Sequence, residues 1–223
     1  MFRLMRIIPP NGWKAVGWEL VIVTIGVLIA LAAQQAIDSS NRRSEAQSFR
    51  TAVDSELTDG LGRYVYRLRE DRCVNDRLDQ LEQWLEGWRT GKPRALRTMI
   101  SAPLSGPAGT SVWQTRDPDV VAHMPSGLKL AYASLYDEIA NYEVQRLDER
   151  MTWFELAQFD RATSLNNDGM MRLQGLITRA RWRAENIVIN TNTFVKQAGK
   201  LGLRAPADAL RADLPKELCQ PIM

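Results

Sequence analysis

Residues 17–35 read GWELVIVTIGVLIALAAQQ, and this stretch decides the architecture of the whole chain. Residues 20–33 carry no charge and consist almost wholly of Leu, Ile, Val and Ala. A helix that crosses a membrane needs about 20 mainly apolar residues, and counting outward from this run reaches residues 15–37. We therefore predict a tail over residues 1–14, a transmembrane helix over residues 15–37 and a separate domain over residues 38–223.

Glu19 is the one charged residue inside the predicted span, and it lies about one turn from the start of that span. At this depth a carboxylate reaches the water of the headgroup region, where Trp13 and Trp18 are placed to form an aromatic belt. The positive end of the helix dipole also favours a negative side chain there. We predict that these three residues anchor the helix at the interface. The alternative is a functional Glu19 that contacts a partner helix inside the membrane.

Basic residues in the short flank predict the orientation of the span. Arg3, Arg6 and Lys14 precede it, and no acidic residue comes before Glu19, whereas acidic residues dilute the basic ones that follow the span. Cytoplasmic flanks carry an excess of Lys and Arg. We therefore predict a cytoplasmic N-terminus and an exterior domain.

A cleaved signal peptide is the main alternative to an uncleaved anchor. The basic start, the apolar core and the tripeptide Ala30-Leu31-Ala32 fit its three-part pattern. These small residues still lie inside the apolar run, and no helix breaker separates them from it. This placement favours an uncleaved anchor.

The membrane segment resembles a family of bacterial single-pass inner-membrane proteins. Gly17 and Glu19 lead into an apolar stretch that contains Ile-Gly-Val-Leu-Ile-Ala-Leu over residues 25–31, and this motif carries the resemblance. The resemblance implies a bacterial inner-membrane location, contact with membrane lipid and a helical periplasmic domain. It implies nothing about chemistry, because that family has no established activity.

Apolar residues recur at threes and fours along three long stretches of the exterior domain, which is typical of amphipathic helices. The first stretch contains Phe49, Val53, Leu57, Leu61, Tyr64, Leu68, Val74, Leu78, Leu81, Leu85 and Trp88, with one slip near Asp71. No Pro separates it from the membrane segment, so that one helix can continue from the span into the domain. Residues 125–159 and 167–200 contain the other two, and no convincing strand alternation is present.

These patterns predict an all-α fold. We expect an N-terminal transmembrane helix that continues into an elongated antiparallel bundle of about three long helices, since helices with apolar stripes bury them against one another. Short helical segments are predicted over residues 95–100, residues 117–124 and from Pro206.

The charge balance of the exterior domain argues against nucleic acid as a partner. The chain has 29 basic and 26 acidic residues, of which three basic residues and Glu19 precede Asp38. The remainder is nearly neutral, whereas nucleic-acid binders concentrate basic charge on one surface. The one dense basic cluster, residues 179–183, is interpreted as the solvated face of a helix, with anionic lipid or phosphate binding as the alternative.

The two cysteines, Cys73 and Cys219, are disulfide candidates. Two is an even number, and the predicted exterior location is one where disulfides persist. A bridge would fasten the C-terminal tail to the first long helix and stabilise the fold by about 4–5 kcal/mol. Two free thiols and redox catalysis are the alternatives.

The sequence offers little for catalysis, and we predict no enzyme, no cofactor and no metal site. His123 is the single histidine; with Asp119 it provides too few ligands for a metal, and we expect an ordinary capping or packing role. Tyr132, Tyr136 and Tyr142 form an aromatic stripe that is interpreted as bundle core, with a ligand pocket as the alternative.

Three functional hypotheses follow. The first is a membrane-anchored helical interaction or scaffold module of the bacterial envelope, with a protein partner or a second copy of the chain. The second is a helical-bundle sensor or small-ligand-binding domain that acts through a partner membrane protein. A pocket between helices favours the second, and a close-packed bundle with an exposed apolar patch favours the first. The third hypothesis is an envelope hydrolase, which would need His123 in a cleft beside a nucleophile.

Overall fold

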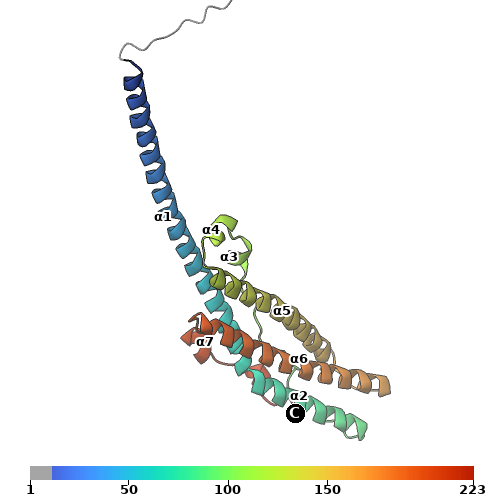
Figure 1. Ribbon diagram of the computed structural model, residues 1–223. Coiled ribbons are helices and arrows are strands. Elements are labelled where there is room, and N and C mark those ends of the chain that lie inside the picture. Colours follow the sequence, from blue (N-terminus) through green and yellow to red (C-terminus); the bar gives the residue numbers. More distant parts are fainter. Residues whose placement is uncertain (1–11) are drawn as a thin grey trace, which may run out of the picture. The chain divides into compact units, whose positions relative to one another are not determined.

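The computed structural model describes residues 12–223, with side chains from Gly17 onward, and over this range it contains eight helices and no strand (Figure 1). The helices are α1 (Gly12–Arg69), α2 (Asp71–Arg89), α3 (Ser111–Gln114), α4 (Pro118–Ala122), α5 (Ser126–Ala157), α6 (Asn167–Lys200), α7 (Ala207–Arg211) and α8 (Lys216–Cys219). The predicted all-α fold with a long N-terminal helix and a helical bundle is confirmed.

The chain divides into two compact units, Met1–Ser48 and Phe49–Met223, and α1 continues across the boundary. In the first unit every side chain over residues 17–37 is exposed, including the large apolar ones. The hydroxyl of Thr24 donates to the carbonyl of Leu20, 2.7 Å away, so that this polar group is satisfied within the helix. Among the described residues, α1 is the one helix long and apolar enough to cross a membrane.

The second unit has a core built from the C-terminal part of α1 with α2, α5, α6 and α8. At one end, Tyr64 of α1 packs on Tyr142 of α5 and Phe194 of α6, with ring centroids 3.9 and 4.7 Å apart. At the other end, α2 packs on α6 and on the C-terminal segment; this apolar cluster includes Leu78 and Ile222, both fully buried. Helix α6 is therefore shared by both ends of the core.

Contacts between the helices define their directions. Ser134 and Glu155 of α5 contact Gln197 and Arg172 of α6, so that α5 and α6 are antiparallel. Between α1 and α5 the contacts advance in the same direction along both helices. Asp54 contacts Tyr132, and Arg67, further along α1, contacts Glu149, further along α5. Helix α5 thus runs parallel to α1. The long connection over residues 90–125 leads the chain back from the end of α2 to the part of α1 near Asp54, where α5 begins.

Local sequence explains the helix ends. The side chain of Asp117 accepts from the N–H of Asp119 at the start of α4, where Pro118 takes the first position. Asn166 caps α6 in the same way, accepting from the N–H of Gly169 at 2.8 Å. Gly91 follows α2 with a φ of 69°, a backbone conformation that glycine adopts without strain.

The structure corrects several predicted boundaries. The first long stretch is two helices, because α1 ends at Arg69 and a single turn residue, Glu70, separates it from α2; the slip in the apolar pattern lies beside this break. Residues 95–100 form no helix, because the backbone bonds the C-terminal segment instead of itself; the N–H of Arg97 donates to the carbonyl of Ile222. Helices α3 and α8 were not predicted, and α5 ends before Phe159.

Candidate functional site

The outer face of α5 carries an exposed apolar row, which we call the α5 stripe and define as Val144, Leu147, Met151 and Phe154. Their side chains are 69, 51, 56 and 64% exposed. Spacings of three, four and three residues put all four on one line along a helix. Between them, Arg146, Glu149, Thr152 and Trp153 turn inward and are buried. The α5 stripe is therefore a continuous apolar surface on the side of α5 opposite the core.

The sequence analysis missed this surface. It predicted one amphipathic helix over residues 125–159 and no second apolar face, whereas in the structure Leu147 lies on the outside. The reason is that α5 is apolar on both faces: Tyr142, Leu156 and their neighbours face the core, and the α5 stripe faces solvent. The 3-4-3 spacing was the signal that could have found it.

The three tyrosines that the sequence analysis interpreted as bundle core, with a ligand pocket as the alternative, lie in the core of the structure. Tyr132, Tyr136 and Tyr142 are at most 6% exposed. Trp113 from α3 stacks on Tyr136, with ring centroids 5.0 Å apart and planes 8° from parallel, and it meets Tyr132 edge-on at 6.3 Å. Tyr142 packs on Tyr64 of α1. The protein's own aromatic side chains therefore occupy the space that a ligand would need beside these rings.

Glu56 of α1 holds the short helix α3 against the bundle. Its carboxylate accepts from the hydroxyl of Tyr136 at 2.6 Å, from the N–H of Val112 at 3.0 Å and from the hydroxyl of Ser111 at 3.1 Å. Burial acts to raise the pKa of Glu56, but these hydrogen bonds outweigh it, and the pKa lies below its ordinary value. The position of Trp113 over the tyrosines thus depends on an ionised carboxylate.

The structure joins Cys73 of α2 and Cys219 of α8 in a disulfide, with Cα atoms 4.8 Å apart. Arg77, one turn further along α2, is fully buried, and its guanidinium donates to the carbonyls of Glu217, Leu218 and Gln220 at 2.6 to 2.9 Å. These contacts satisfy carbonyl groups at the end of α8 that have no partner within the helix. The C-terminal segment is therefore an integral part of the core.

Three charged side chains, Arg67, Glu70 and Glu149, form what we call the buried charge cluster, and all three are 0% exposed. Arg67 donates through Nε and Nη2 to both carboxylate oxygens of Glu149, at 3.2 and 2.5 Å. Glu70 accepts from the N–H of Leu104 at 3.0 Å, while its other oxygen has no hydrogen-bond partner. The sequence analysis missed this cluster, because no pattern marks a charge that the fold will bury.

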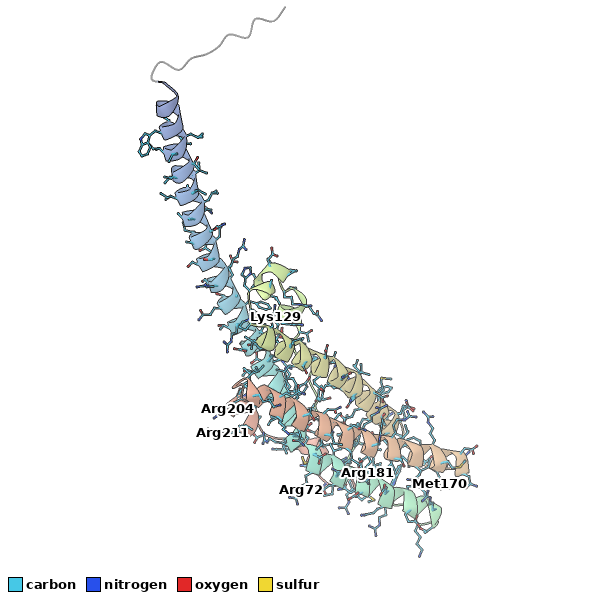
Figure 2. The ribbon with its side chains drawn as sticks, viewed as in Figure 1. Arg72, Lys129, Met170, Arg181, Arg204 and Arg211 are labelled. Atoms are coloured by element: carbon cyan, nitrogen blue, oxygen red, sulfur yellow. A yellow bond between two sulfur atoms is a disulfide. The ribbon has the colours of Figure 1, made fainter. Side chains whose placement is uncertain are left out.

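The basic cluster over residues 179–183 is largely paired with acidic side chains. Arg181, labelled on α6 in Figure 2, has partners on α2. It bonds Asp79 at 2.8 Å and lies 3.2 Å from Glu82. Arg183 pairs with Asp148 of α5, and its guanidinium stacks over Trp182 at 4.4 Å. These residues connect α6 to its neighbours, which leaves little free basic charge for a phosphate or lipid headgroup.

The remaining predicted residues are placed as follows. Trp18 and Glu19 are exposed on α1, and the side chain of Trp13 lies outside the described residues. His123 caps the end of α4 and contacts the carbonyl of Asp119 through Nδ1 at 2.6 Å. Among the described residues no group of three or more His, Cys, Asp or Glu side chains is arranged to hold a metal ion.

One open cleft of about 570 Å³ lies between residues 96–101, the turn that follows α5 and the C-terminal segment. Arg97, Arg161, Asp160 and Glu217 give its wall both signs of charge. Asp160 is already engaged with the N–H of Ile100 at 2.8 Å. The cleft has no further feature that selects a ligand.

Comparisons of the chain with protein-family models, curated proteins and solved structures found no match. The resemblance to bacterial single-pass membrane proteins therefore stays a prediction from the membrane segment.

Proposed function

We propose that this chain is a membrane-anchored helical interaction module of the bacterial envelope, and that the α5 stripe pairs it with a second copy of itself. The α5 stripe is the observation that carries this proposal. Four large apolar side chains, each more than half exposed, stand in one row on a helix whose opposite face is packed into the core. Covering such side chains stabilises an association by about 1 kcal/mol or more for each.

The geometry of the α5 stripe favours another helix as its partner. Spacings of three and four residues are those by which apolar side chains of one helix fit between those of another. The 3-4-3 order is the same when read from either end. The α5 stripe of a second copy, placed antiparallel to the first, therefore has apolar side chains at the same intervals. A surface that is complementary to itself supports a two-fold symmetric dimer.

The membrane anchor in this proposal is the apolar part of α1. Its large side chains over residues 20–37 are exposed, whereas a core helix of a soluble domain would bury them. The positive-inside asymmetry of the sequence supports a cytoplasmic N-terminus and a periplasmic domain. An anchor of this kind holds copies at one surface, which raises their effective concentration and lets a modest interface form dimers.

The sensor hypothesis has weaker support. It needs a small-molecule pocket between the helices, and the tyrosine stripe that suggested one is filled by Trp113 and Tyr64.

The test compares two Leu→Glu variants of the full chain in detergent micelles or nanodiscs. Leu147→Glu puts a charge into the α5 stripe, and Leu210→Glu puts the same charge at a leucine of α7 that is also 51% exposed. We expect the parent and Leu210→Glu to dimerise and Leu147→Glu to lose at least about tenfold in dimer affinity, measured by analytical ultracentrifugation. Monomers throughout, or equal dimerisation of both variants, would refute the proposal. Loss of a different co-purifying protein from Leu147→Glu alone would refute the second copy as the partner.

A further inference from the structure

We propose that Glu70, the residue between α1 and α2, is a proton-binding group that controls the segment over residues 102–108. Protonated Glu70 keeps this segment in place, and release of its proton loosens it. This inference does not depend on how the chain dimerises.

Glu70 occupies a structurally sensitive place. It is the single residue between two long helices: its N–H bonds the carbonyl of Tyr66 at 3.3 Å, and its carbonyl accepts from the N–H of Val74 at 2.9 Å. The backbone of Glu70 is therefore fixed by hydrogen bonds to both helices, while its side chain points to the segment over residues 102–108.

The charges around Glu70 do not balance when all groups are ionised. From α1, Arg67 faces it and Tyr66 lies nearby; from α5, Glu149 faces it. The covering segment, residues 102–108, contains no ionisable side chain. The one cation, Arg67, is already bonded to both oxygens of Glu149. Two carboxylates and one guanidinium, all without solvent contact, carry one negative charge too many.

A proton on Glu70 removes this excess charge. Glu149 is held by Arg67, whereas Glu70 has one oxygen bonded to the N–H of Leu104 and another that is buried and free of partners. Burial raises the pKa of Glu70 to about 7; the Leu104 N–H and the charge of Arg67 act to lower it, and Glu149 acts to raise it. The proton is therefore released in the neutral range, well above the ordinary value of 4.5.

The segment over residues 102–108 is held in place by hydrogen bonds from its backbone to three charged side chains, and Glu70 is one of them. Glu70 accepts from Leu104, Arg146 donates to the carbonyl of Ser105 at 3.3 Å, and Glu143 accepts from the N–H of Ala108 at 3.1 Å. An ionised Glu70 gains stability from water, and water reaches it only when this segment moves. Opening of the segment is thus linked to release of the proton.

The test is hydrogen exchange of the full chain in detergent micelles, read by mass spectrometry for peptides that cover residues 100–108 and corrected for the intrinsic effect of pH. Between pH 6 and pH 8 we expect the parent to lose about tenfold in protection there. Glu70→Gln keeps the size and stays neutral, and its protection should not change with pH. Glu143→Gln weakens another contact of the same segment, and it should lower protection while it keeps the pH dependence.

Two results would overturn the inference: a Glu70→Gln variant with the pH dependence of the parent, or a parent whose protection does not change. A second measurement on the parent avoids reliance on any variant. The infrared spectrum at pH 6 should contain a buried protonated carboxyl band that disappears by pH 8; absence of this band at pH 6 would equally reject a proton on Glu70.

Discussion

Two buried arginines show how single residues hold this bundle together. Arg67 is neutralised by Glu149 across the α1 and α5 interface, whereas Arg77 meets backbone carbonyls of the C-terminal segment and of Met99. A buried cation is tolerated only where such partners satisfy it. Each arginine therefore fixes a contact between segments that are distant in the sequence.

Replacing Arg77 by Met should lower the free energy of unfolding by about 2–4 kcal/mol, because the carbonyls of α8 lose their donors. Arg72→Met on the same helix is the matched control, since the side chain of Arg72 is 92% exposed (Figure 2). Denaturant unfolding of the full chain, followed by tryptophan fluorescence, measures both. Equal stability of the two variants would contradict the role given to Arg77.

The contribution of Glu56 to stability should depend on pH in the opposite direction to that of Glu70. Its pKa is lowered in the folded state, so its contribution to stability is present above the ordinary value of 4.5 and is lost as pH falls through the folded value. Glu56→Gln should cost about 1 kcal/mol at pH 7 and less at pH 3. Urea unfolding at the two pH values measures this difference. A cost that is the same at both would show that the ionised form of Glu56 is not needed.

Glu19 provides a third test at this scale. If Glu19 is an interfacial anchor, Glu19→Gln should insert and associate like the parent, because the amide also reaches headgroup water. Crosslinking at equal expression compares the two chains. A clear loss of partner from the Gln variant would make Glu19 a contact within the membrane.

At the scale of elements, the spacing of apolar residues and the capping residues predicted the helices whose ends depend on local sequence. The bounds of α6 follow from its apolar stripe and the Asn166 cap, and α4 follows from Asp117-Pro118. The break at Glu70 appeared in the sequence as a slip in the pattern. The α5 stripe was not predicted, because its 3-4-3 spacing marks a second apolar row on the helix but does not say which row the fold covers. Helices α3 and α8, each of four residues, were not predicted either, because their positions depend on Glu56 and Arg77.

Two glycines of α1 give a prediction for how α7 packs. A Cβ at Gly62 would lie 3.1 Å from Pro206 and 3.3 Å from Ala209, whereas at Gly60 the nearest atom is Ala108 Cβ at 3.4 Å. Alanine is favoured over glycine in a helix by about 1 kcal/mol. Gly60→Ala should therefore be stabilising, and Gly62→Ala should gain less or lose stability because α7 must shift. Thermal unfolding ranks the two, and the reverse order would contradict this packing.

At the scale of the whole molecule, the disulfide closes a sequence separation of 146 residues and holds the last helix on α2. Cys73→Ser should lower stability by about 4–5 kcal/mol if loop closure dominates. Non-reducing gels of membrane-extracted protein should show a faster band that reductant and Cys73→Ser both remove. Full alkylation of both thiols without reductant would contradict a disulfide in the cell.

The predicted topology is a further test at this scale. Reporter fusions placed after Ile37 should show the exterior phenotype, and the membrane-bound chain should keep residues 17–37. A mature N-terminus near Ala33 would establish cleavage and remove the anchor from this account.

The central claim is that the α5 stripe of a membrane-anchored chain meets a second copy. The most direct measurement places a photo-reactive residue at position 147 or at position 210 in the full chain and irradiates intact membranes. We predict a crosslinked dimer from position 147 and none from position 210. Equal crosslinking from both positions, or no dimer from position 147, would contradict the claim.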